Sequence, residues 1–170
     1  MRLILAPMTR EDLDEVMGLE KKAFSSPWTR GMYLREMEKE EGYYITCRCD
    51  GQLVGYGGVL VIMDEAHVMT LAVREDFRRR GVAMRMLLEL IRVAEAKGAR
   101  FLTLEVRKSN QAAIELYDKA GFQIMGERKH YYIDNLENAL IMWTEDISSP
   151  EYRRLLRALE ERYGHAGEGR

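Results

Sequence analysis

Three consecutive arginines run directly into a glycine at residues 78–81 of this sequence. The apolar spacing after the glycine predicts a helix that begins there, and the first turn of a helix offers free N–H groups and a positive dipole end. Because glycine lets the backbone approach an anion closely, this junction predicts a phosphate or pyrophosphate site. A solvated turn is the alternative interpretation. A nucleic-acid patch is disfavoured, since acidic residues adjoin the arginines and no aromatic residues are interleaved with them.

The composition fits one ordinary globular domain. The chain has 170 residues, 46% of them hydrophobic and 32% charged, with a formal net charge of -2. This balance gives no global reason to expect nucleic acid as a partner. No segment approaches the roughly 20 apolar residues that cross a bilayer, and the apolar run near Met1 is too short for a secretory signal. We therefore expect a soluble, cytoplasmic protein with no membrane partner.

The two cysteines lie close together in the sequence. Cys47 and Cys49 alternate with Arg48 along a predicted strand, so both thiols point to one face, toward the core. Two thiols are too few for a structural zinc site, and a disulfide between residues two apart would be strained. We expect reduced, buried cysteines and predict no metal site.

Hydrophobic spacing predicts the elements that must position the arginine run: strand, two helices, three strands, helix, strand, helix, two strands and a final charged helix. Strands are expected at 2–6, twice within 43–63 around a hairpin at Asp50-Gly51, and at 66–73, 101–106, 122–133 and 138–146. Helices are expected from Thr9 to Phe24, from Pro27 to Glu40 with Ser26 as cap, from Gly81 to Lys97, from Asn110 to Gly121, and from Pro150 onward, fraying in its last residues. The third helix carries a polar stripe of Arg85, Glu89 and Arg92.

Three segments resemble the GNAT superfamily of acetyl-coenzyme A (acetyl-CoA) dependent N-acetyltransferases, and most of all its RimI-type N-terminal acetyltransferases. They are HVMTLAVREDFRRRGVAMRML, LEVRKSNQAAIELYDKAGF and RKHYYIDNLENALIM, and the resemblance covers residues 2–147. It implies an α/β fold with a mixed, mostly antiparallel seven-stranded sheet flanked by four helices. The expected organisation is an acetyltransferase domain at 1–147 and a C-terminal helical extension at 148–170 that could cover the sheet edge, dimerise or bind a partner.

The resemblance also implies which residues bind acetyl-CoA. The family's phosphate signature falls on Arg78, Gly81 and Ala83, and backbone groups of Leu71 and Val73 would pair with the pantetheine arm. The complete expected set is Leu71, Ala72, Val73, Arg78, Arg79, Arg80, Gly81, Val82, Ala83, Met84, Asn110 and Tyr117.

For catalysis, the resemblance implies Glu105 as general base and Tyr117 as the acid near the thioester sulfur. A carboxylate can take the proton of an α-ammonium group, and a phenol with a pKa of about 10 stays protonated at neutral pH. A strand N–H near Leu71 would hold the oxyanion, so the amine would attack directly, without an acetyl-enzyme. Taken alone, Glu105 could be a solvent-facing strand residue and Tyr117 a core residue. His67 and His130 are alternative bases of lower rank.

For the substrate, the resemblance implies contacts from Phe24, Trp28, Tyr131 and Tyr132. Trp28 could instead anchor the second helix, and the two tyrosines could be cross-strand packing residues, although adjacent strand residues face opposite sides and at least one should be exposed. Asn138 replaces an acidic residue that is usual in RimI-type proteins, which leaves the peptide preference open.

These residues lead to a functional hypothesis. We expect an acetyl-CoA dependent N-terminal α-amino acetyltransferase that acts on an N-terminal alanine or serine of a ribosomal protein. Acetylation of lysine side chains or of a small-molecule amine is the first alternative, because a fold does not fix a substrate. A non-catalytic acyl-CoA sensor ranks lower, since a sensor needs no acid-base pair. The sequence does not indicate an oligomeric state.

Overall fold

The structure, a computed structural model, describes residues 1–164. The strands are β1 Leu3–Pro7, β2 Gly42–Cys49, β3 Gln52–Ile62, β4 Glu65–Val73, β5 Phe101–Arg107, β6 Gln123–Tyr132 and β7 Glu137–Trp143. The helices are α1 Leu13–Ala23, α2 Arg30–Met37, α3 Val82–Ala96, α4 Gln111–Lys119 and α5 Pro150–Tyr163, with short 3-10 turns at Arg10–Asp12 and Glu75–Phe77. The predicted element order is confirmed.

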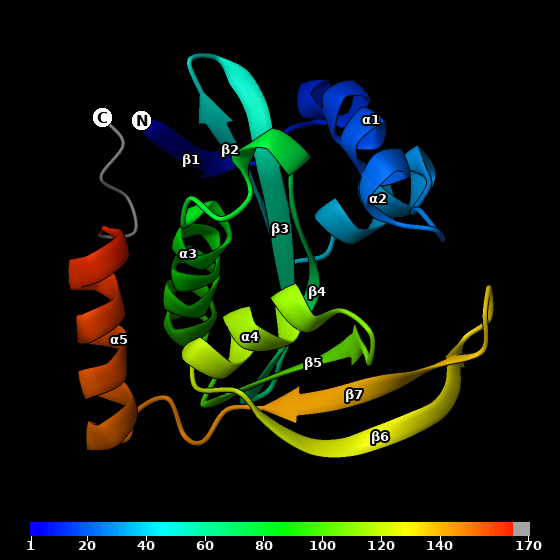
Figure 1. The fold of residues 1–170 in the computed structure, drawn as a ribbon. Coiled ribbons are helices and arrows are strands. Elements are labelled where there is room, and N and C mark those ends of the chain that lie inside the picture. Colours follow the sequence, from blue (N-terminus) through cyan, green and yellow to red (C-terminus); the bar gives the residue numbers. More distant parts are fainter. Residues whose placement is uncertain (165–170) are drawn as a thin grey trace.

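The seven strands form one sheet in the order β1-β2-β3-β4-β5-β7-β6. All neighbours pair antiparallel except β4 and β5, which are parallel and pair over only three residues each, ending at His67 opposite Thr103. Beyond that point the two strands separate, so β1–β4 and β5–β7–β6 form two half-sheets that diverge (Figure 1). The predicted mixed, mostly antiparallel fold is confirmed.

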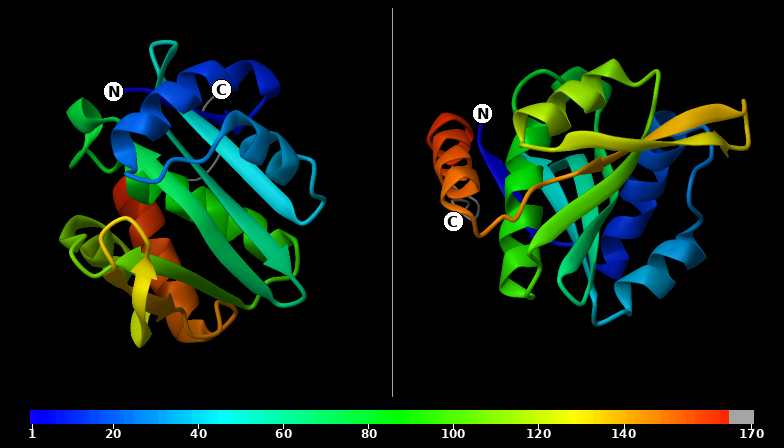
Figure 2. Two further views of the ribbon diagram at one scale, coloured as in Figure 1. Left: turned by 90° about the vertical axis from the view of Figure 1, so that its right-hand side faces the viewer. Right: turned by 90° about the horizontal axis from the view of Figure 1, so that it is seen from below.

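The helices lie in layers on the two faces of the sheet. Helices α1 and α2 cover one face, α3 and α4 cover the other, and α5 lies outside α3 (Figure 2). Two apolar clusters hold the layers together. The larger one joins the sheet to α3, α4 and α5, and the smaller one packs Leu13, Val16 and Tyr33 of α1 and α2 against the sheet. This burial is the main favourable term that fixes the half-sheets relative to their helices.

Local sequence signals explain several features. Asp50 and Gly51 both have positive φ, 49° and 80°, as the predicted two-residue hairpin turn requires. Cys47 and Cys49 are free and buried, as predicted. Thr9 caps the first turn through a capping box with Asp12, although that turn is a 3-10 turn and α1 proper begins at Leu13.

The prediction for the second helix was wrong at its start. Helix α2 begins at Arg30, not Pro27, and its cap is Thr29, whose hydroxyl accepts the Met32 N–H at 3.2 Å, so Ser26 caps nothing. The preceding segment is held as a loop by long-range bonds, because the Trp28 N–H donates to the Glu20 carboxyl group at 3.0 Å. Tertiary contacts therefore override the local Ser-Pro signal.

One member of the predicted polar stripe on α3, Glu89, lies away from solvent. This side chain is buried and pairs with Arg92 at 2.7 Å. The sheet lies on one side of α3 and α5 on the other, so only a narrow strip of the helix reaches solvent. Helix α5 forms as predicted, and the expected fraying of the tail falls on residues 165–170, outside the described part of the chain.

Candidate active site

Backbone groups of β4 line the gap between the half-sheets. The Arg74 N–H donates to the Val54 carbonyl at 2.8 Å, so by the alternation of an antiparallel ladder Ala72 and Thr70 also bond to β3. The N–H and C=O groups of Leu71 and Val73 therefore face the gap toward β5. The register slips by one residue at Met69, which bulges β4 where the strands begin to separate.

A concave run of amides lies where β4 gives way to α3. Arg79 and Gly81 both have positive φ, 62° and 79°, and no side chain caps α3. The Arg85 N–H is bonded to the Gly81 carbonyl at 3.0 Å, so the amides of Val82, Ala83 and Met84 precede that bond at the positive end of the helix. Such a concavity suits a pyrophosphate group.

The side chains near the start of α3 differ in what they contact. Val82 and Met84 are buried in the core, so these two residues can offer only backbone groups. The Arg78 Nε donates to the Val73 carbonyl at 3.2 Å, and the Arg80 guanidinium lies 5.3 Å from the Phe77 ring centre. Asn110, expected to approach the cofactor, caps α4 by accepting the Ala113 N–H at 3.2 Å.

Glu105 lies on β5 where the gap opens, and it is paired. Its Oε2 lies 2.6 Å from Nε2 of His67 on β4, and Nε of Arg128 lies 4.0 Å from its Oε1. The hydrogen bond from His67 lowers the pKa of Glu105, although partial burial opposes the shift. The carboxylate is therefore ionised at neutral pH, with its side chain 15% exposed, and is available to accept a proton.

Tyr117 lies in the wall of the core on α4, where its ring packs 5.5 Å from that of Phe122. Burial raises the pKa of Tyr117, and nearby Tyr132 adds to the shift. The phenol therefore keeps its proton throughout the neutral range. This proximity brings a predicted catalytic residue and a predicted substrate residue together.

A second network connects two loops on the α1 and α2 face. The Ser25 hydroxyl, just after α1, donates to Asp134 of the β6–β7 hairpin at 2.6 Å. Arg107 of β5 donates to both, at 3.0 Å each to Ser25 Oγ and Asp134 Oδ2, and its guanidinium lies 3.9 Å from the Tyr132 ring centre. Burial raises the pKa of Tyr132 to about 12. We call Ser25, Arg107 and Asp134 the loop-hairpin link.

The other predicted substrate residues differ in exposure. Tyr131 is 46% exposed and Phe24 is 36% exposed, whereas Trp28 is half-buried and packs on Tyr33 at 4.9 Å between ring centres. Trp28 therefore packs as a hydrophobic anchor against α2, and its contact with a substrate stays a prediction. His130, the other candidate base, is exposed on β6 with its Nδ1 3.1 Å from the Leu136 carbonyl.

Sequence reasoning did not single out the link or a buried carboxyl group beneath it. Glu20 is 2% exposed and accepts hydrogen bonds from the Trp28 N–H and from the hydroxyls of Tyr33 and Tyr56. A sequence signal existed, because Glu20 follows Leu13 and Val16 at helical spacing on the buried face of α1. Glu20 therefore holds the end of the loop that carries Ser25, just before α2.

The sequence of this chain also matches that of a known protein family. The sequence profile of the Acetyltransferase (GNAT) family matches residues 13–122. The chain belongs to this family. It is therefore an N-acetyltransferase, and the resemblance inferred from the motifs is confirmed.

Individual relatives support the same placement of this GNAT chain. It is 39% identical over 137 residues to the putative ribosomal protein bS18-alanine N-acetyltransferase of Bacillus subtilis, covering 80% of this chain and 91% of that protein. The crystal structure of the ribosomal-protein-S18-alanine N-acetyltransferase from Escherichia coli matches with a TM-score of 0.78 at 30% identity, covering 88% of this chain and 97% of that one. A Thermoplasma acidophilum N-acetyltransferase solved in complex with coenzyme A shares the fold, with a TM-score of 0.70 at 17% identity over 85% of this chain and 99% of that one.

Residues 1–164 contain neither a cluster of metal-binding side chains nor a membrane-spanning helix. No three His, Cys, Asp or Glu side chains gather there as a metal site. Within the same range, every helix is too short or too polar to cross a membrane.

Proposed function

We propose that the chain is an acetyl-CoA dependent N-terminal α-amino acetyltransferase of the cytoplasm, acting on an N-terminal alanine or serine of a ribosomal protein. The observation that carries the proposal is the pairing of Glu105 with His67 at the mouth of the gap whose other end is the uncapped start of α3. The names of the Bacillus and Escherichia relatives support the choice of substrate.

The residues present fit acetyl-CoA. Uncapped amides from Arg79 to Met84 suit its pyrophosphate, and the backbone groups of Leu71 with the N–H of Val73 suit an extended arm lying in the gap. When bound, acetyl-CoA supplies an activated acetyl group as a thioester. The N–H groups of Leu71 and Val73 offer fixed donors for the charge that develops on the carbonyl oxygen.

Glu105 and Tyr117 then divide the proton transfers. The substrate α-ammonium has a pKa of about 8, so an ionised Glu105 can remove its proton directly or through one water. His67 holds the carboxylate in place through the 2.6 Å contact. Tyr117 keeps its phenolic proton and can donate it to the leaving thiolate. The amine would attack the thioester directly.

Peptide acetylation tests the proposal. One peptide has a free N-terminal alanine and no lysine, and the other has a blocked N-terminus and one lysine; each is incubated with acetyl-CoA and weighed by mass spectrometry. We expect a mass gain on the first peptide only. Gain on the second alone would make the chain a lysine acetyltransferase, and gain on neither would favour a small-molecule amine or a sensor.

Glu105→Gln tests the assigned base. The amide is nearly isosteric but cannot accept a proton, so turnover at neutral pH should fall about a hundredfold or more. Acetyl-CoA affinity, measured by calorimetry, should be unchanged because Glu105 contacts His67 and Arg128 and is not among the proposed pyrophosphate contacts at the start of α3. Glu127→Gln is a matched control, since Glu127 is a carboxylate on β6 that pairs with Lys108. An unchanged rate for Glu105→Gln would remove it as base.

A further inference from the structure

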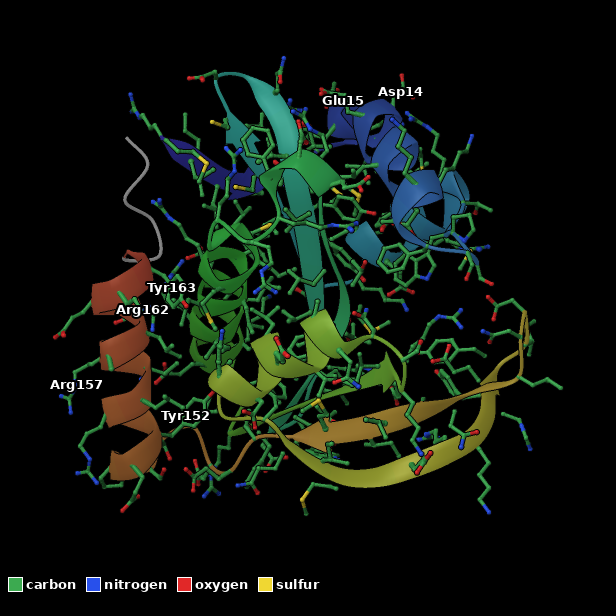
Figure 3. All side chains as sticks on the ribbon, viewed as in Figure 1. Asp14, Glu15, Tyr152, Arg157, Arg162 and Tyr163 are labelled. Carbon is green, nitrogen blue, oxygen red and sulfur yellow. The ribbon has the colours of Figure 1, made fainter. Side chains whose placement is uncertain are left out.

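Helix α5 contacts α3 and α4, the two helices that carry proposed acetyl-CoA contacts. Its buried residues Tyr152, Leu156 and Leu159 belong to the same core as α3, and Arg153 pairs with Glu95 of α3 at 2.9 Å. The family match ends at residue 122, before this helix. Tyr152 and Tyr163 lie at opposite ends of α5, toward α3 (Figure 3). The family profile therefore does not account for the role of α5.

The N-terminal end of α5 supports the C-terminal end of α4. The Tyr152 hydroxyl donates to the Ala120 carbonyl at 2.8 Å, and a side-chain carbon placed at Gly121 would lie 2.7 Å from the Tyr152 ring. Tyr152 therefore packs directly against the stop of the helix that carries Tyr117. This contact is deep in the core, since Tyr152 is 1% exposed.

The other end of α5 supports the start of α3. A side-chain carbon placed at Gly81 would lie 2.9 Å from Cδ1 of Tyr163, and within the described chain no other side chain, apart from those of the neighbours Arg80 and Val82, comes within 4 Å of that point. Gly81 is the left-handed residue that turns the backbone into α3. The ring of Tyr163 thus packs directly against the Gly81 turn.

We propose that Tyr163 is a positioning residue for acetyl-CoA binding, which it favours by holding the Arg79–Gly81 turn in its left-handed form. The inference rests on the proposed use of acetyl-CoA. Amides bind an anion well only when they already point to a common centre, and a turn that must be ordered on binding loses affinity. Without the ring, the space beside Gly81 is left empty, and the turn can adopt other backbone conformations. By reciprocity, a bound cofactor would tighten the last turn of α5.

Calorimetry of acetyl-CoA binding to Tyr163→Ala tests this role. We expect the dissociation constant to rise about three- to tenfold, with KM for acetyl-CoA rising in parallel and kcat unchanged. Tyr163→Phe keeps the ring and should bind like the wild type. Leu159→Ala is the matched control, because Leu159 lies one turn earlier on the same buried face and does not reach Gly81. It should lower thermal stability while leaving the dissociation constant unchanged.

A second measurement uses the unaltered protein. Hydrogen exchange of the wild type, with and without acetyl-CoA, should show slower exchange in the last turn of α5 when the cofactor is present. Wild-type affinity in Tyr163→Ala, or equal weakening in Leu159→Ala, would overturn the role of Tyr163 and leave the proposed function standing. No cofactor binding by the wild type would instead overturn the proposed function, and this inference with it.

Discussion

Glu105 accepts its hydrogen bond from a residue 38 positions away in the chain. His67 and Glu105 meet because the parallel pairing of β4 and β5 ends at His67 and Thr103, which leaves the two side chains beside each other at the opening. The bond lowers the pKa of Glu105. At the residue scale, the activity of the base therefore depends on a neighbour that is itself titratable.

Replacing His67 with alanine should shift the pH dependence of the reaction. The bond stabilises the ionised carboxylate, so its removal raises the pKa of Glu105 and protonates the base at a higher pH. The acidic limb of the kcat/KM profile should therefore move to higher pH, as measured by initial rates across the pH range. His130→Ala is the control, because His130 contacts the Leu136 carbonyl. An acidic limb that moves for His130→Ala and stays in place for His67→Ala would contradict this account.

Motifs predicted Glu105 and Tyr117 as candidates, but their partners could not be predicted. A single strand pattern shows which positions alternate and gives no register with a parallel neighbour. The pairing with His67 follows from that register. The position of Tyr132 near Tyr117 likewise follows from how β6 and β7 extend past α4, which local spacing does not encode.

At the element scale, the loop-hairpin link joins segments separated by 109 positions. It fixes the loop after α1 against the β6–β7 hairpin, and Arg107 lies two residues beyond Glu105 on β5. A peptide approaching Glu105 from this face would meet both segments. If the proposed peptide enters here, the link holds the two segments that it would pass.

Asp134→Ala should loosen this approach. Ser25 and Arg107 lose their common acceptor, so the loop is held less firmly against the hairpin, and KM for the peptide should rise about two- to fivefold with little change in kcat. Exposed ion pairs contribute little to stability, so the thermal midpoint should hardly change. Asp146→Ala is a matched control, because it removes a carboxylate that pairs with Arg100 at the far end of β7. Steady-state kinetics with peptide as the varied substrate measures the effect, and equal KM values would count against the link.

The elements themselves were largely predictable, with one instructive failure. Alternation and turn signals placed the strands to within a few residues, because strands such as β5 alternate buried and partly exposed residues and turns mark the strand ends. The Ser-Pro signal at residues 26–27 misplaced the start of α2, because Glu20 and Asp134 bind the loop from elsewhere in the fold. Local propensity fails where distant residues supply the hydrogen bonds.

At the scale of the whole molecule, several carboxylates are ionised more readily in the folded protein than in the unfolded chain. Hydrogen bonds from Ser109 lower the pKa of Glu137 from 4.5 to about 2, and those from Ser148 lower the pKa of Asp146 from 3.8 to about 2. Glu137 joins the start of β7 to Ser109, and Asp146 joins the segment after β7 to Ser148. The folded state therefore binds these protons more weakly than the unfolded state does.

Stability should fall as the solution becomes acidic. A depressed pKa contributes stability above the unfolded value, and that contribution is lost as pH falls from 4.5 toward 2. Thermal denaturation followed by circular dichroism should show a midpoint that drops across this window. A double variant, Glu137→Gln with Asp146→Asn, should be less stable at neutral pH and show a shallower drop. Parallel curves for the two proteins would argue against these two carboxylates.

The separation of β4 and β5 also bears on association between copies of the chain. Unpaired N–H and C=O groups along a strand usually invite another sheet to add to it, and so promote aggregation. Here the unpaired edge of β4 is not at the rim of the sheet, because β5 and the second half-sheet follow it. A narrow extended chain can lie in such a recess, whereas a folded sheet edge is too broad. The fold thus retains a strand edge that one extended chain can reach and that the sheet edge of another folded protein cannot.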